Sequence, residues 1–120
     1  MMPGVPPPLA LNHLNLPARD PDALRAWYAR TFGFVEHGRF LWSGGSLLVF
    51  VPGEPIARKE THFGFRVSSL DELHAWAKTL GGRGLPCEVE GDETYSRAFV
   101  KDPEGNGIEV FYEPLPATGR

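Results

Sequence analysis

The chain contains an internal repeat, which constrains its fold more than any other feature of the sequence. Residues 11–34 align with residues 60–83 at a shift of 49 positions, the separation between His13 and His62. Further along, LLVFVPGEP resembles IEVFYEP, after a longer insert in the second copy. A repeat of this length predicts two copies of one structural unit. The identical pairs are His13/His62, Asp22/Asp71, Leu24/Leu73, Ala26/Ala75, Trp27/Trp76 and Gly33/Gly82.

Each copy has the pattern of a strand, a helix and three more strands. The runs LALNHLNL and HFGFRV alternate as strands do, and each carries one histidine. Asp20-Pro21 and the run SLDE at 69–72 are typical helix starts, while Gly33 and Gly82 are typical helix ends. Short strands are predicted after the helices, at 34–38, 39–43 and 46–51 and again at about 85–90, 94–101 and 106–112.

The predicted fold is therefore α+β, with two tandem βαβββ modules in one domain spanning residues 9–114. Module one covers about 9–52 and module two about 60–114, with a polar linker at 52–60. Residues 1–8 and 115–120 are predicted to be tails. A length of 120 residues suits one domain of this size.

Composition excludes several classes of function. The net charge of -3 provides no basic field for nucleic acid or anionic lipid, so neither is expected as a partner. No apolar run reaches a membrane span, and the first residues do not resemble a signal peptide, so a cytoplasmic location is expected. The single cysteine, Cys87, excludes an internal disulfide and a cysteine-rich zinc site.

Three residues form the strongest candidate site: His13, His62 and Glu109. The two histidines occupy equivalent strands of the two modules. Glu109 lies in the apolar run IEVFY, where a buried carboxylate is costly unless it is paired or binds a metal. Two imidazoles and one carboxylate form a charge-balanced site for a divalent ion with open coordination positions.

These residues resemble those of the vicinal oxygen chelate superfamily, which includes glyoxalases, bleomycin-resistance proteins and dioxygenases. The resemblance runs from about residue 9 to residue 114 and rests on the segments NHL at 12–14, THF at 61–63 and DPEGNGIE at 102–109. It implies that His13, His62 and Glu109 bind a divalent metal (Fe, Mn, Zn, Ni or Co). It also implies a curved mixed sheet around a central cavity, a small-molecule substrate and a homodimer, which would cover exposed sheet edges.

The sequence departs from the four-ligand pattern of glyoxalase I. Aligning Val49-Phe50 with Val110-Phe111 places Leu48 at the fourth position, so three ligands are expected. Strand parity places Tyr95 and Arg97 near Glu109 as candidate catalytic residues, Tyr95 for proton transfer and Arg97 for binding an anionic substrate group. The remaining histidines, His37 and His74, have no repeat partner and are expected on the surface.

The sequence is compatible with two functions. The first is a metalloenzyme that uses a divalent ion as Lewis acid on a substrate held through two adjacent oxygens, as a lyase, dioxygenase or transferase. The second is a metal-free protein of the bleomycin-resistance type that sequesters a small molecule. Its cavity would have aromatic walls, for which the candidates are Phe40, Trp42, Phe99 and Phe111.

Overall fold

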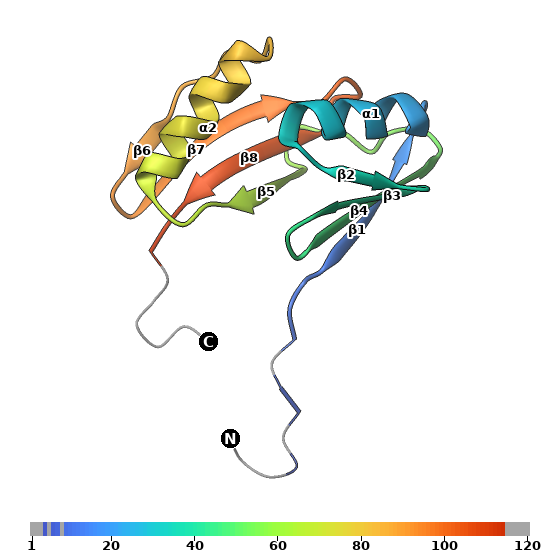
Figure 1. Ribbon diagram of the computed structural model, residues 1–120, viewed down its shortest axis with the longest axis horizontal. Helices are drawn as coiled ribbons and strands as arrows, with labels where there is room; N and C mark the ends of the chain where they lie inside the picture. Colours follow the sequence, from blue (N-terminus) through green and yellow to red (C-terminus); the bar gives the residue numbers. More distant parts are fainter. Residues whose placement is uncertain (1–3, 5, 8, 115–120) are drawn as a thin grey trace.

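The protein consists of two similar modules, each a four-stranded sheet with one helix packed on it (Figure 1). The computed structural model describes residues 4, 6–7 and 9–114; the predicted tail at 115–120 lies outside these residues, as do positions 1–3, 5 and 8 of the other tail. Within the described ranges, no helix is long and apolar enough to cross a membrane. The predicted α+β class with two βαβββ modules is confirmed.

The two modules share one topology. In both sheets the first strand pairs in parallel with the last, and the other pairs are antiparallel. The orders are β1-β4-β3-β2 and β5-β8-β7-β6. Module one contains β1 (His13–Ala18), α1 (Pro21–Phe32), β2 (Val35–His37), β3 (Phe40–Ser43) and β4 (Ser46–Pro52). Module two contains β5 (His62–Arg66), α2 (Leu70–Gly82), β6 (Glu90–Asp92), β7 (Tyr95–Lys101) and β8 (Gly107–Tyr112).

Both helices begin where their capping residues predict. The Asp20 side chain accepts a hydrogen bond from the Ala23 amide at 3.1 Å, and Ser69 accepts one from the Glu72 amide at the same distance. Gly33 ends α1 with φ of 75°, a left-handed conformation that glycine adopts at little cost. Local capping chemistry thus sets the helix boundaries.

Two predicted strands differ from their expected ranges. The first was expected from residue 9 but begins at His13, because its partner β4 begins only at Ser46, directly after the turn at residues 44–45. The strand expected at about 85–90 is not formed there: after Pro86, which lacks an amide donor, the chain becomes a strand only at β6 (Glu90–Asp92). Leu9 and Leu11 are consequently exposed.

Aromatic side chains from both modules form one continuous core. Tyr28 of α1 packs on Phe50 with ring centroids 5.1 Å apart. Phe65 of β5 contacts Phe32 and Phe34, with centroids 5.6 and 5.5 Å away. Trp27 forms T-shaped pairs with Tyr28 and Phe32 and is 9% exposed. The two modules therefore pack through apolar contacts as well as through the linker.

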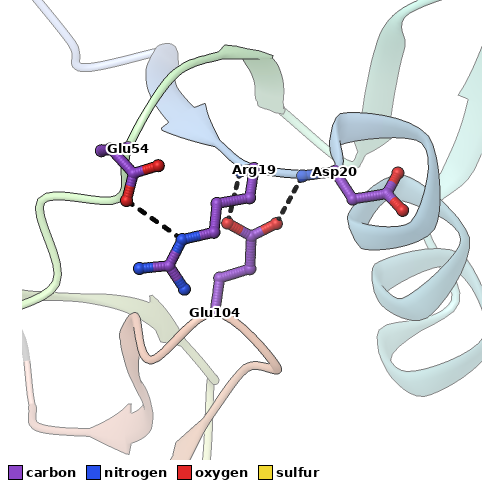
Figure 2. Close-up of polar contacts among 4 residues, drawn as sticks. All are labelled: Arg19, Asp20, Glu54 and Glu104. Carbon is purple, nitrogen blue, oxygen red and sulfur yellow. Dashed lines mark hydrogen bonds and ion pairs between the residues drawn. The ribbon is translucent and has the colours of Figure 1, made fainter.

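The turn between β7 and β8, residues 102–106, joins module two to the start of α1 (Figure 2). The Glu104 carboxylate accepts hydrogen bonds from the amides of Arg19 and Asp20, at 2.6 and 2.9 Å. Arg19 also pairs with Glu54 at 3.1 Å, but both side chains are largely exposed, so this ion pair adds little stability. The charge-assisted hydrogen bonds from the backbone amides of Arg19 and Asp20 to Glu104 are the stronger contact.

Asp102 carries the buried part of the same junction. Asp102 is 4% exposed, and its carboxylate accepts hydrogen bonds from the Tyr28 hydroxyl at 2.7 Å and from the side-chain and backbone nitrogens of Asn106 at 2.8 and 3.0 Å. Burial, followed by the nearby Asp102 charge, raises the pKa of Tyr28 far above its ordinary value. Tyr28 therefore stays a neutral donor to the carboxylate.

We expect Tyr28→Phe to lower the free energy of unfolding by about 1.5–3 kcal/mol, because a buried carboxylate loses a hydrogen bond. Urea denaturation followed by circular dichroism measures this change. Tyr112→Phe is the matched control, since the Tyr112 hydroxyl makes no hydrogen bond within the described part of the chain. Equal losses in the two variants would show that the Tyr28–Asp102 bond is not important.

Candidate metal centre

One face of the second sheet gathers the polar residues of the candidate site. Gly64 of β5 and Phe99 of β7 both lie opposite Glu109 of β8, and Arg97 lies opposite Phe111. Because side chains alternate along a strand, His62, Tyr95 and Arg97 project from the face that carries Glu109. The other face carries Ile108 and Val110, which belong to the core together with Leu73 and Leu80 of α2.

Glu109 is the centre of this face. Its side chain is 6% exposed, and its Oε2 atom lies 2.7 Å from His62 Nε2 and 3.1 Å from Arg97 Nη1. The Tyr95 hydroxyl donates to the other carboxylate oxygen. Gly64 leaves room for this arrangement, because a Cβ there would lie 3.0 Å from the Phe111 ring. The chain thus holds a buried carboxylate with three partners of different chemistry.

Tyr95 is fixed by stacking as well as by its hydroxyl. Its ring lies parallel to that of Phe111, with centroids 5.8 Å apart and an interplanar angle of 19°. Desolvation, followed by the hydrogen bond to Glu109, raises the pKa of Tyr95 to about 12. The hydroxyl is therefore protonated at neutral pH.

This raised pKa predicts a pH effect in the alkaline range. The folded protein favours the neutral phenol, so the stabilisation is complete below the ordinary tyrosine pKa of 10.0 and is lost as the pH rises to about 12. The difference between the ultraviolet titrations of the native chain and Tyr95→Phe should be centred near pH 12. A midpoint near pH 10.0 would show that the contact with Glu109 is absent in solution.

His13 does not join this cluster within one chain. It is exposed on β1 and lines a recess between the modules with Leu47 and the residues 63–65 of β5. Across the described ranges, no three side chains of histidine, cysteine, aspartate or glutamate are close enough to hold one ion. A single chain brings together His62, Glu109, Tyr95 and Arg97, and His13 lies apart from them.

The sequence alignment placed the fourth ligand position at Leu48, one residue away from the position that the strand register gives. Gly64, two residues after His62, lies opposite Glu109, and Asn15, two residues after His13, lies opposite Val49. Val49 is therefore the equivalent of Glu109, and the expectation for Leu48 was wrong. Leu48 points to the other face of the sheet and is 3% exposed in the core. A shift of one residue reverses the face in a strand, which explains the error.

The matching face of module one is apolar where that of module two is polar. Val49 lies opposite Phe40, and Leu47 lies opposite Trp42, which is 42% exposed. The Arg39 guanidinium lies 5.5 Å from the centre of the Phe40 ring. This face thus offers an aromatic surface on β3, which β4 separates from the strand that carries His13.

The other residues considered from the sequence lie away from the site. His37 is exposed at the end of β2, and His74 is exposed on α2. The Cys87 sulfur lies 4.0 Å from the Ala77 carbonyl oxygen, on the α2 side of the sheet, and burial raises the pKa of its thiol. None of the three shares the face that carries Glu109.

Paired βαβββ modules with a histidine on each opening strand and a carboxylate on the last strand define the class of this protein. The chain belongs to the Glyoxalase/Bleomycin resistance protein/Dioxygenase superfamily, whose model matches residues 10–110. A curated relative, the probable trivalent organoarsenical cleaving enzyme of Bacillus subtilis (strain 168), is 30% identical in an alignment of 99 residues, and the match covers 72% of this chain and 68% of that protein.

Two solved structures share the fold. Lactoylglutathione lyase from Agrobacterium tumefaciens superposes with a TM-score of 0.71 at 23% identity, over 89% of this chain and 96% of that chain. The fosfomycin resistance protein FosX from Listeria monocytogenes superposes with a TM-score of 0.74 at 16% identity, over 89% of this chain and 95% of that chain. At these identities the likeness establishes the fold alone.

Proposed function

We propose that this protein is a divalent-metal enzyme whose ion is bound by His62 and Glu109 of one chain and by His13 of a second chain in a homodimer. The observation that carries this proposal is the buried Glu109 carboxylate with His62 Nε2 at 2.7 Å. A carboxylate at the centre of a sheet is costly to bury, and a divalent ion with a neutral imidazole compensates that cost.

The donor atoms fit a divalent ion. Metal–nitrogen and metal–oxygen bonds of about 2.0–2.2 Å allow two atoms that lie 2.7 Å apart to bind the same ion. Two imidazoles and one carboxylate leave about three octahedral positions for water and substrate. This donor set suits Fe²⁺ or Mn²⁺ and also accepts Zn²⁺, Ni²⁺ or Co²⁺.

The position of His13 supports a site shared between two chains. It is exposed on β1, which is an edge strand of the first sheet, and β5 with His62 is an edge strand of the second. Edge strands and exposed apolar side chains such as Val35 and Trp42 are surfaces that a second copy would cover. A twofold dimer would form the same site twice.

When bound, the ion supplies Lewis-acid polarisation of a substrate oxygen. The Tyr95 hydroxyl is protonated beside Glu109 and can donate a hydrogen bond or a proton to a developing oxyanion. Arg97 can hold an anionic substrate group beside Glu109, because its contact with that carboxylate is made by Nη1 and the guanidinium has five N–H donors. The apolar face with Trp42 and Val49 would exclude water from the reacting atoms.

Metal loading tests this function directly. We expect untagged protein incubated with each of the five ions to bind about one ion per chain, measured by mass spectrometry after gel filtration, and to melt at a higher temperature. The exposed aromatic surface around Trp42 favours the alternative of a metal-free sequestering protein. Substoichiometric metal and an unchanged melting temperature would support that alternative and contradict the metalloenzyme.

Cleavage of trivalent organoarsenicals, the activity named for the relative, is not supported by the thiol chemistry of this chain. Trivalent arsenic is a soft centre that prefers thiolate ligands. Cys87 is the single cysteine of the sequence, and it lies on the α2 side of the sheet. We therefore propose a substrate that is bound through oxygen.

The corrected position of the fourth ligand gives a matched pair of variants. Val49→Glu places a carboxylate on the face of His13, so we expect it to raise the affinity for zinc or nickel at least about tenfold. Leu48→Glu places the same charge in the core and should destabilise the fold without raising the affinity. Calorimetric titration measures the affinity, and unchanged binding by Val49→Glu would show that Val49 does not face the ion.

A further inference from the structure

A second recess is lined by residues of the linker between the modules and of the 102–106 turn, and by Gly107, which lies opposite His62. Its walls include three cationic side chains, Arg58, Lys59 and Lys101, together with Phe99 and the backbone of Gly107. All three cationic residues are exposed. In the part of the chain that the structure describes, none of them forms an ion pair with a carboxylate.

The one carboxylate at this recess is already engaged elsewhere. Glu104 also lines it, but both of its oxygens accept hydrogen bonds from the amides of Arg19 and Asp20, at 2.6 and 2.9 Å (Figure 2). The negative charge is therefore held at the start of α1. The recess keeps a positive balance, which favours an anion.

One aromatic ring connects the recess to the candidate metal centre. Phe99 lies opposite Glu109, and its ring rests on Gly107, where an added Cβ would lie only 2.7 Å from the ring. The same ring and the His62 imidazole form a T-shaped pair, with centroids 6.2 Å apart and an interplanar angle of 75°. Arg97, which binds Glu109, also places its guanidinium 5.3 Å from the ring centre. A ligand lying along Phe99 would reach both places.

We infer that this recess binds the phosphate or carboxylate group of an organic substrate, whose apolar part lies on Phe99 and whose other end reaches His62 and Glu109. Lysine and arginine bind such oxyanions through charge-assisted hydrogen bonds, and the exposed part of the Phe99 ring, which is 37% exposed, provides an apolar contact for an aromatic or planar substituent. The contact of the substrate with the metal at His62 and Glu109 rests on the proposed function, whereas the binding of its anionic group in this recess does not.

The test measures anion binding in the absence of metal. Phenyl phosphate and inorganic phosphate are titrated into the full chain in the presence of a chelator, with chemical shifts or heat as the signal. We expect Lys101→Glu to weaken both ligands at least about tenfold, because it replaces an attractive charge with a repulsive one. Lys78→Glu, the same change on the exposed surface of α2, should have no effect. Equal affinities in these two variants would overturn the inference.

A second variant tests the role of the ring. Phenyl phosphate should bind more tightly than inorganic phosphate to the native chain, and Phe99→Leu should remove this difference. Equal binding of the two ligands to the native chain would overturn the role of Phe99. Metal affinity is also measured for Lys101→Glu, so that anion binding and metal binding are tested separately. Anion binding without metal binding would overturn only the proposed function, and metal binding without anion binding would overturn only this inference.

Discussion

Replacing Glu109 by glutamine should reduce the affinity for divalent metal by at least about 100-fold, because an amide provides neither the charge nor the strong oxygen donor of a carboxylate. His62→Ala and His13→Ala should cause losses of similar size, since each removes a whole ligand. Calorimetric titration with Mn²⁺ and Zn²⁺ measures the affinities. The expectation for Glu109 is the strongest of the three, because its side chain is 6% exposed and already contacts His62.

His37→Ala and His74→Ala provide matched controls for the histidine variants. Both residues are exposed and lie away from the Glu109 face, so their replacement should leave metal affinity unchanged. Loss of binding in either control, with binding retained in His13→Ala, would mean that the site is assigned to the wrong histidine. Melting temperatures of all variants separate loss of a ligand from loss of the fold.

Joining two inactive chains should restore metal binding. A heterodimer of a His13→Ala chain and a Glu109→Gln chain is purified through two different tags. In a shared site, one of its two positions combines His13 of one chain with His62 and Glu109 of the other. We expect about one ion per heterodimer, against about two for the native dimer and almost none for either mutant homodimer.

This experiment also tests the assembly itself. A site built within a single chain would leave the heterodimer without metal, because each chain would lack one of its own ligands. A chain that remains monomeric at micromolar concentration in light scattering would likewise contradict the shared site. The result depends on which chains are combined. It therefore tests whether the site is shared between two chains, separately from which residues are the ligands.

The sequence predicted those parts of the fold that depend on local chemistry. Asp20, Ser69 and Gly33 set helix ends through their own backbone and side-chain preferences, and the structure places the ends there. Strand parity also placed Tyr95 and Arg97 on the face of Glu109, because alternation within a strand needs no tertiary information.

The parts that the sequence did not predict depend on pairing between segments far apart. The repeat shift of 49 residues that aligns His13 with His62 becomes 60 between Val49 and Glu109, and letter matching at this insert was wrong by one residue. The separation of His13 from Glu109 likewise follows from how the modules pack on one another. The residue pattern within one segment does not indicate how the two modules pack on one another.

The 102–106 turn has a consequence for a dimer of such chains. It binds the amides that precede α1 through Glu104 and the Tyr28 hydroxyl through Asp102, and it leads directly into the strand that carries Glu109. This short turn therefore helps to set the angle between the two halves of a chain, together with the aromatic core that joins them. Each chain of the proposed dimer would contribute one half to each of two sites. Ligand binding that changes this angle at one site would therefore alter the geometry of the other, which is the structural requirement for cooperativity between them.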